Sequence, residues 1–129
     1  MKQTIYTDAA PEPVGPYSQA IKVGDLVYLS GQVPLDPKTG LLVEGGIEEQ
    51  TARVCENVKA VLEAEGLYFD DVIKTTCYLI DMDEFAAFNA VYATYFPEES
   101  ARACVAVAAL PKGARVEVET IASIPARQG

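Results

Sequence analysis

Residues 101–122, ARACVAVAALPKGARVEVETIA, decide the fold class because they contain the most apolar segment of the chain. Every side chain from Ala103 to Leu110 is small or apolar, which predicts a strand buried on both faces. A further strand is expected over 115–123, after the turn Leu110-Pro111-Lys112-Gly113. Taken locally, the pattern favours a simple hairpin of strands near 101–109 and 115–123.

Arg102 lies at the start of this apolar strand, and no acidic residue is nearer in sequence than Glu99. A guanidinium group at the edge of a buried strand requires an anionic partner, because an unpaired charge is costly to desolvate. One candidate partner is a structural carboxylate of the protein. The other is the carboxylate of a bound substrate, held by the bidentate fork of the arginine. The pattern of residues leaves both interpretations open.

The first half of the chain predicts a hairpin and a helix. Residues 17–23 and 26–30 are expected to form two strands joined by Gly24-Asp25, a two-residue hairpin turn. A helix should follow, because apolar residues recur at helical spacing before Gly66, which suits the C′ position. These residues are Ile47, Val54, Val58, Val61 and Leu62.

The second half predicts another strand and another helix. Residues 72–80 are rich in β-branched and aromatic side chains, which is typical of a long strand. Asp81 and Glu84 resemble a capping box that opens a helix, and Pro97 is expected to end that helix. The helix carries an aromatic stripe, interpreted as core rather than as a cofactor site. The stripe consists of Phe85, Phe88, Tyr92 and Tyr95.

The expected order ββαβαββ is typical of an α+β domain in which two helices cover one face of a mixed sheet. Apolar residues are nevertheless expected on both faces. Strand 72–80 should present Val72 and Tyr78 on one side, with Cys77 and Leu79 on the other. The uncovered face therefore needs an apolar partner, and a second copy of the chain is the simplest one.

Length, charge and hydropathy narrow the class of protein. The 129 residues suit a single domain over 1–129. The net charge of −9 argues against a nucleic-acid partner, because phosphate contacts need a basic surface. No apolar run exceeds the eight residues 103–110, so no membrane span is expected. The first 13 residues lack the continuous apolar segment of a signal peptide, so we expect a cytoplasmic protein.

The chain contains no histidine, which rules out Ser-His-Asp and Cys-His nucleophilic sites built from it alone. The three cysteines, Cys55, Cys77 and Cys104, form no C-x-x-C pair. No disulfide framework and no metal site are therefore predicted, and the cysteines are interpreted as buried structural thiols. Catalysis would depend on carboxylates, arginine, tyrosine, backbone amides and water.

Seven short segments between about residues 7 and 124 form a recognisable set. They are Val14-Gly15-Pro16-Tyr17-Ser18-Gln19-Ala20, Ser30-Gly31-Gln32, Asn57-Val58-Lys59-Ala60, Phe88-Asn89, Arg102-Ala103-Cys104, Leu110-Pro111-Lys112-Gly113 and Val116-Glu117-Val118-Glu119. In this order and at this spacing they resemble the reactive intermediate deaminase family, the RidA or YjgF type. One departure is Ser100, where the family commonly has proline, and this leaves the strand entry less restrained.

The resemblance implies a chorismate-mutase-like α+β fold assembled as a homotrimer, with three clefts between subunits. It also implies hydrolysis of 2-aminoacrylate and related enamine or imine acids to 2-keto acids and ammonia, without a cofactor. Such substrates are released by pyridoxal-phosphate enzymes. In the family the last strand lies between the first hairpin and the middle strand, which conflicts with the simple hairpin expected locally.

By position, the resemblance implies that Arg102 binds the substrate carboxylate and that Glu117 positions and polarises a water molecule. The backbone of Cys104 would line the same pocket, while its thiol would not be a required nucleophile. An alternative for Glu117 is an ordinary solvent-facing carboxylate.

The resemblance implies that four further residues complete the site. Tyr17 is expected beside the catalytic groups, and Ser30, Gly31 and Asn89 are expected to shape the substrate-binding walls. For Tyr17 and Asn89 the alternative is an ordinary surface or capping role.

Two other functions remain as alternatives. A non-catalytic trimer could sense small keto or amino acids with Arg102, but it would have no use for Glu117. Some relatives have been linked to ribonuclease or translation-inhibiting activity, which the net charge of −9 disfavours here. Chorismate-mutase chemistry would need more cationic side chains than Arg102.

We also expect the site to be shared between subunits. On a hairpin centred near residues 111–112, Arg102 and Glu117 would be offset by about four residues, or ~13 Å along the sheet. The hypothesis is that Arg102 and Cys104 of one subunit face Glu117 and Tyr17 of its neighbour.

Overall fold

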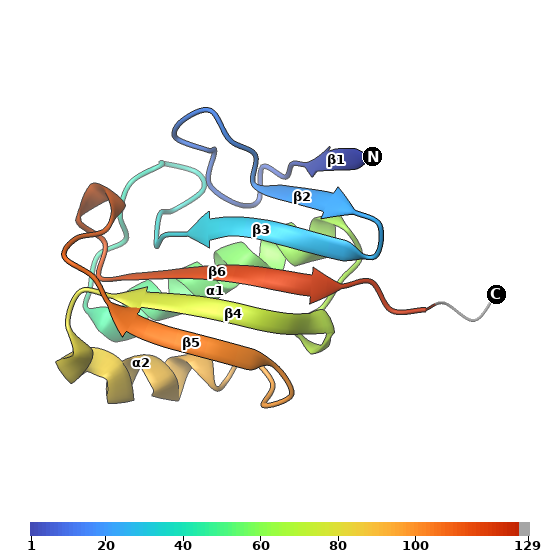
Figure 1. Cartoon of the computed structure of the whole chain (residues 1–129). Helices are drawn as coiled ribbons and strands as arrows, with labels where there is room; N and C mark the ends of the chain where they lie inside the picture. Colours follow the sequence, from blue (N-terminus) through green and yellow to red (C-terminus); the bar gives the residue numbers. More distant parts are fainter. Residues whose placement is uncertain (127–129) are drawn as a thin grey trace.

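Six strands form one mixed sheet in the computed structural model, which describes residues 1–126. The strand order is β1-β2-β3-β6-β4-β5, with β4 and β5 parallel and all other neighbours antiparallel. The strands are β1 (Lys2–Ile5), β2 (Ala20–Val23), β3 (Leu26–Gln32), β4 (Val72–Leu79), β5 (Ala101–Ala106) and β6 (Val116–Ser123). Helices α1 (Ile47–Ala64) and α2 (Phe85–Tyr92) both lie on one face of the sheet (Figure 1). The predicted α+β class, with two helices on one face, is confirmed.

The predicted N-terminal hairpin is confirmed by the antiparallel pairing of β2 with β3. Gly24 adopts φ 58° in the two-residue turn, a conformation that glycine reaches without steric cost. Strand β1, which pairs with β2, was not predicted. It has only four residues at the sheet edge, too few for a period-2 pattern to stand out.

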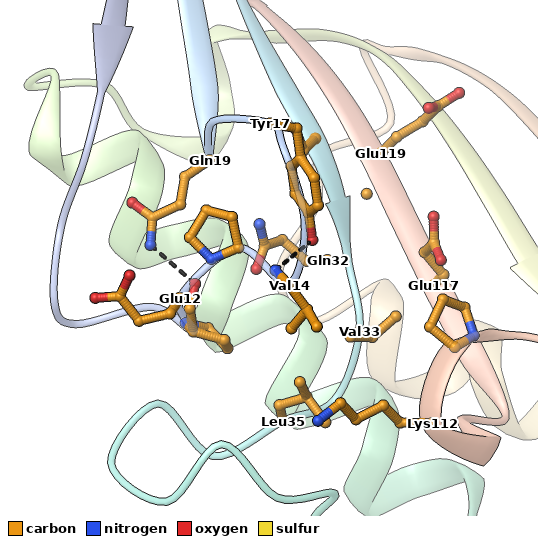
Figure 2. A pocket seen from close by; sticks show the side chains of 15 residues that line it. Glu12, Val14, Tyr17, Gln19, Gln32, Val33, Leu35, Lys112, Glu117 and Glu119 are labelled. Carbon is orange, nitrogen blue, oxygen red and sulfur yellow. Dashed lines mark hydrogen bonds between the residues drawn. The ribbon is translucent and has the colours of Figure 1, made fainter.

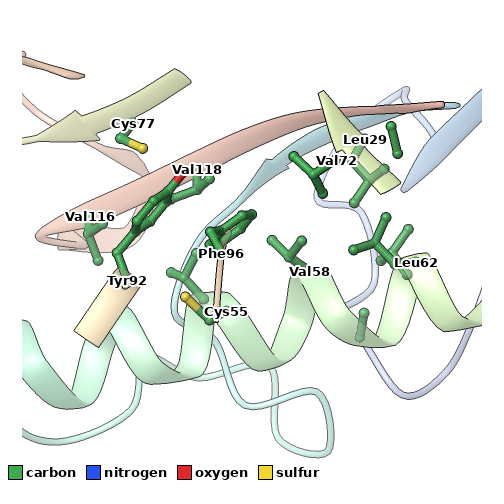
Figure 3. Packing of buried hydrophobic residues seen from close by; sticks show 14 of the residues in the cluster. Leu29, Cys55, Val58, Leu62, Val72, Cys77, Tyr92, Phe96, Val116 and Val118 are labelled. Carbon is green, nitrogen blue, oxygen red and sulfur yellow. The ribbon is translucent and has the colours of Figure 1, made fainter. Parts of the chain in front are cut away.

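Helix α1 also forms as predicted, and Gly66 follows its C-terminal end at the C′ position. Gly66 adopts φ 70°, and its N–H donates to the carbonyl of Glu63, while the N–H of Leu67 donates to the carbonyl of Leu62. These two bonds form a Schellman motif, which satisfies carbonyl groups at the helix end. Val58 and Leu62, on the same face of the helix, are fully buried against the sheet (Figure 3).

The second helix begins and ends differently from the prediction. Asp81 accepts a hydrogen bond from the N–H of Asp83 at 2.9 Å, but it caps a short 3-10 turn (Met82–Glu84) that leads into α2. Regular α-helix stops at Tyr92, ahead of the predicted end at Pro97, and hydrogen-bonded turns continue to Phe96.

The aromatic stripe is core in part: Phe88 and Tyr92 are buried as predicted, whereas Phe85 and Tyr95 are partly exposed and pack against the core. Tyr92 stacks on Phe96 with ring centroids 4.3 Å apart, and Phe88 lies 5.3 Å from Tyr92. Phe88 is completely buried. Burial of a side chain of this size contributes about 1.5–3 kcal/mol.

A register shift in β4 corrects the predicted faces of this strand. The pairing of β4 with β6 shifts between Val72 and Lys74, so Val72 joins Cys77 and Leu79 on the helix-covered face. Tyr78 stays on the opposite face, which no element of residues 1–126 covers and which we call the open face. The bulge reverses the alternation that an unbroken strand would have.

The predicted hairpin of the last two strands is wrong, in the way that the family resemblance implied. Strand β6 lies between β3 and β4, whereas β5 pairs only with β4 and forms the sheet edge. The chain crosses over through α2 to place β5 parallel to β4, a connection that a short turn cannot make. Nor is β5 buried on both faces within one chain, because all its residues except Cys104 are exposed.

The three cysteines are free thiols. Cys55 and Cys77 are buried as predicted, whereas Cys104, which was also predicted to be buried, is partly exposed because β5 forms the sheet edge. No helix within residues 1–126 is both long and apolar enough to cross a bilayer.

Candidate functional site

The predicted site residues fall on opposite faces of the sheet. Residues that are register partners on neighbouring strands point to the same face. Arg102 is the partner of Thr75, whose side chain is fully buried on the helix-covered face. Glu117 is the partner of Tyr78, on the open face. Within one chain, Arg102 and Glu117 therefore point away from each other, although both were expected to act on one substrate.

A cleft of about 520 Å³ on the open face contains most of the predicted residues. In Figure 2, Tyr17 and Glu117 lie on opposite sides of it, while Lys112 and Leu35 lie at one end. The cleft is lined by Pro11, Glu12, Pro13, Val14, Tyr17, Gln19, Ser30, Gly31, Gln32, Val33, Leu35, Pro111, Lys112, Glu117 and Glu119. The structure thus brings together Tyr17, Ser30, Gly31 and Glu117.

Glu117 projects from β6 and lies directly over the backbone of Gly31 on β3. A Cβ atom at position 31 would lie 2.0 Å from Glu117 Oε2 and 2.8 Å from its Cδ, which is closer than any real contact. Only glycine therefore leaves room for this carboxylate. Burial raises the pKa of Glu117, and the nearby charge of Glu119 raises it further. The carboxyl group is half-buried and lines the cleft.

Glu119 is a residue of the cleft that the sequence prediction did not assign. It lies two residues from Glu117 on the same face of β6, and its Oε1 accepts a hydrogen bond from the Tyr78 hydroxyl at 3.0 Å. The signal was present in the sequence, because alternate residues of a strand share a face. Glu119 places a second negative charge beside Glu117.

The other wall of the cleft consists of the loop before β2. The Tyr17 hydroxyl accepts a hydrogen bond from the N–H of Val14 at 3.2 Å, so this side chain both braces the loop and lines the cleft. Ser30 Oγ donates to the carbonyl of Ser18 at 2.6 Å. Gln19, which is 2% exposed, fastens the loop further by bonds from its amide to backbone groups. Its Nε2 donates to the carbonyls of Thr7, Ala10 and Pro11, and its Oε1 accepts from the N–H of Thr7.

Arg102 and Asn89 line a second cleft, of about 360 Å³, between α2 and the start of β5. Arg102 Nη1 donates to Asn89 Oδ1 at 2.6 Å. Within residues 1–126 the ion pairs are Lys22–Glu65 and Arg115–Glu84, and neither includes Arg102. A structural carboxylate therefore does not pair with Arg102 in the described part of the chain.

Cys104 lies on β5 opposite Cys77 of β4. Burial raises the pKa of the Cys104 thiol, although the positive charge of Arg102 lowers it in part. The thiol is therefore protonated at neutral pH, which disfavours a nucleophilic role. Among residues 1–126, no three His, Cys, Asp or Glu side chains are grouped closely enough to hold a metal ion.

Comparisons with known proteins agree with the motifs. The family model described as Endoribonuclease L-PSP matches residues 7–124. A RutC family protein of Pyrococcus horikoshii is 54% identical over 123 residues, covering 95% of this chain and 98% of that protein. A 2-iminobutanoate/2-iminopropanoate deaminase of Salmonella typhimurium is 45% identical over 126 residues, covering 95% and 98%. The crystal structure of RidA from the Antarctic bacterium Psychrobacter sp. is 50% identical, with a TM-score of 0.90 and coverage of 95% and 99%.

Proposed function

The chain belongs to the Endoribonuclease L-PSP family, the RidA/YjgF type that its motifs indicated, and from this premise we propose that it is an imine deaminase. The reaction is R–C(=NH)–COO⁻ + H₂O → R–CO–COO⁻ + NH₃, with 2-aminoacrylate-type enamines entering as their imine tautomers. The relative of Salmonella typhimurium, matched over 98% of its length, carries the name of this activity. No cofactor is needed, because the imine carbon is already electrophilic.

The observation that carries this proposal is the position of Glu117 in the open-face cleft. A half-buried carboxylate with a raised pKa is a stronger base than an ordinary glutamate. Glu117 accepts a proton from water as the oxygen bonds to the imine carbon. It delivers this proton to the imine nitrogen, which gives the carbinolamine R–C(OH)(NH₂)–COO⁻. Glu117 then takes the proton of the new hydroxyl group and passes it to the amino nitrogen, so that the C–N bond breaks, ammonia leaves and the keto group forms. Arg102 would hold the substrate carboxylate throughout.

The separation of Arg102 from Glu117 implies that the site is built by two copies of the chain. Register places them three residues apart along β4 and two strands apart, or about 14 Å between Cα atoms. They also point to opposite faces. Arg102 lies on the edge strand β5, where its side chain could extend into the cleft of a neighbouring chain. We propose that it completes the open-face cleft of that neighbour, in a homotrimer.

Exposed apolar side chains on the open face support the association of copies. Tyr28 is 46% exposed and Val105 is 46% exposed, and both lie on the face that the helices do not cover. A second copy would remove this apolar surface from water. Light scattering coupled to gel filtration should therefore give a mass near three times 13.9 kDa. A stable monomer at micromolar concentration would overturn the shared site.

A coupled assay tests the activity. A pyridoxal-phosphate serine or threonine dehydratase would generate the enamine in situ, and the keto acid would be followed with and without this protein. We expect faster keto-acid formation with the wild type and only the uncatalysed rate with Glu117→Gln. A protein that binds keto acids but does not accelerate their formation would instead be a sensor.

Mixing two inactive variants tests whether the site is shared. Arg102→Ala and Glu117→Ala chains, unfolded and refolded together, should regenerate some wild-type clefts and recover part of the activity. Each variant refolded alone is the control. Confirmed mixed assemblies without any recovery would show that both groups act from one chain.

A further inference from the structure

Helix α2 presents three side chains to the guanidinium group of Arg102. Phe85, Asn89 and Tyr92 follow the spacing i, i+4, i+7, which places them on one face of a helix. Asn89 already belongs to the predicted site, whereas the two aromatic rings have no role in the proposed reaction. Both rings contact the guanidinium group of Arg102, and Arg102 is exposed. These contacts are therefore not part of the packing of the buried core.

The contacts restrain the guanidinium from several sides. Its central carbon lies 5.0 Å from the centre of the Tyr92 ring and 5.5 Å from that of Phe85. Both distances fall within the range at which a cation is attracted to the negative face of an aromatic ring. Nη1 donates to Asn89 Oδ1 at 2.6 Å, which fixes one edge of the group. These contacts use one N–H of the five that an arginine side chain offers.

Tyr92 is itself held in place by contacts with β4 and with Phe96. Its hydroxyl shares a 2.7 Å hydrogen bond with Oγ1 of Thr75, the residue of β4 that is the register partner of Arg102. Its ring stacks on Phe96 at an interplanar angle of 10°. Burial raises the pKa of Tyr92 to about 12, so the phenol stays protonated throughout the physiological range. The same strand pair therefore carries both the arginine and the anchor of the ring beneath it.

We propose that Phe85 and Tyr92 are positioning residues, which hold the Arg102 guanidinium in the orientation that receives a substrate carboxylate. A long side chain on an exposed edge strand would otherwise lose rotational freedom when it binds a ligand, and this loss weakens binding. The rings restrain the group in advance without consuming its N–H donors. The identity of the ligand rests on the proposed function, but the restraint itself does not.

Phe85 allows the clearest test, because it is partly exposed and its replacement should not unfold the protein. Phe85→Leu keeps an apolar side chain but removes the ring. We expect it to raise KM about 3- to 10-fold, the range of one cation–π contact, with kcat changed less than about twofold. Phe85→Tyr restores a ring and should restore the wild-type KM.

Phe69→Leu is the matched control. Phe69 is a partly buried ring that packs edge-on against Phe96, the ring on which Tyr92 stacks, with centroids 4.8 Å apart. Within residues 1–126 the cation–π contacts of Arg102 are with Phe85 and Tyr92, and they do not include Phe69. Replacing Phe69 loosens the packing around Phe96 and Tyr92 to a similar degree but removes no ring from Arg102. The KM of Phe69→Leu should therefore stay at the wild-type value. If Phe69→Leu and Phe85→Leu raise KM equally, the effect is general loosening and the positioning role is overturned.

A second readout does not depend on activity. The Nε–H resonance of Arg102, identified by its absence in Arg102→Lys, senses the ring currents of nearby aromatic groups. Phe85→Leu should move this resonance and Phe69→Leu should not. Phe85→Leu should also weaken binding of 2-oxobutanoate, the probe for a keto-acid carboxylate, by the same 3- to 10-fold.

These readouts separate the two proposals. If the wild type fails to accelerate imine hydrolysis while Phe85→Leu moves the resonance and weakens 2-oxobutanoate binding, the deaminase proposal fails and the positioning role stands. If the wild type hydrolyses imines while Phe85→Leu changes neither KM nor the resonance, the positioning role is overturned and the deaminase proposal stands.

Discussion

Replacing Gly31 with alanine should displace the Glu117 carboxylate without disturbing the fold. The added Cβ would lie 2.0 Å from Glu117 Oε2, whereas ordinary contact begins near 3.4 Å, so the oxygen must withdraw by at least 1.4 Å. The backbone can accept alanine, because Gly31 is not among the glycines with positive φ. The clash involves a flexible side chain, so we expect the free energy of unfolding to change by no more than about 1 kcal/mol.

The effect on catalysis should be much larger than the effect on stability. A displacement of about 1 Å in a reacting group can reduce the rate about 100-fold. We therefore expect kcat/KM for imine hydrolysis in the coupled dehydratase assay to fall roughly 100-fold in Gly31→Ala. Gly46→Ala is the matched control, since a Cβ there meets Glu49 and Glu48 atoms only at 3.8 Å and 4.0 Å.

A double-mutant cycle identifies the cause. Because Glu117→Ala is inactive, the cycle is measured by the binding of 2-oxobutanoate. In that background no carboxylate remains to be displaced, so Gly31→Ala should not change the Kd for 2-oxobutanoate any further. Independent, multiplying losses would mean that Gly31 acts on the substrate and not through Glu117. Wild-type kcat/KM in Gly31→Ala would refute the reasoning altogether.

Three further predictions follow from the same geometry. Arg102→Ala should abolish the acceleration and Arg102→Lys should impair it severely, since lysine keeps the charge but loses the fork; wild-type rates in Arg102→Ala would contradict the carboxylate-binding role. Glu119→Gln removes the like charge that helps to raise the pKa of Glu117, so the acid limb of the kcat/KM–pH profile should move to lower pH, and a limb that stays in place would show that the two carboxylates are not coupled. Gln19→Leu leaves several loop backbone groups without partners and should lower stability by about 2–3 kcal/mol, measured by thermal unfolding, with a higher KM as the cleft wall loosens.

Local patterns in the sequence were sufficient to predict the helices and strands that bury only one face. Helix α1 and the hairpin of β2 and β3 could be predicted because periodicity, turn residues and the C′ glycine Gly66 act over a few residues. Strand β4 was located correctly, but the bulge after Val72 was not, because a register shift depends on the partner strand.

The chemistry of the candidate site was also readable from residue types. A chain without histidine must rely on groups such as Arg102 and Glu117, and both lie in or beside clefts. Glu119 could have been found from its alternation with Glu117. The aromatic restraint on Arg102 could not, because the stripe of α2 has the same spacing whether it faces the core or a cation.

The arrangement of the last two strands could not be predicted from their local pattern, although the family resemblance implied it. The pattern of 101–123 fits a hairpin equally well, yet β6 inserts between β3 and β4 while β5 remains at the edge. Long-range pairing of this kind depends on which strands can bury their apolar faces against α1 and α2. A local pattern carries no information about that choice.

The sequence by itself determined which groups could act, and the tertiary structure decided where they point. Separation of Arg102 from Glu117 was expected from an offset along a hairpin, but its main cause is different. Arg102 is in register with Thr75 and Glu117 with Tyr78, an odd number of residues apart on β4, so they face opposite sides of the sheet. A shift of one residue would have placed them on one face, because side chains alternate along a strand with period 2.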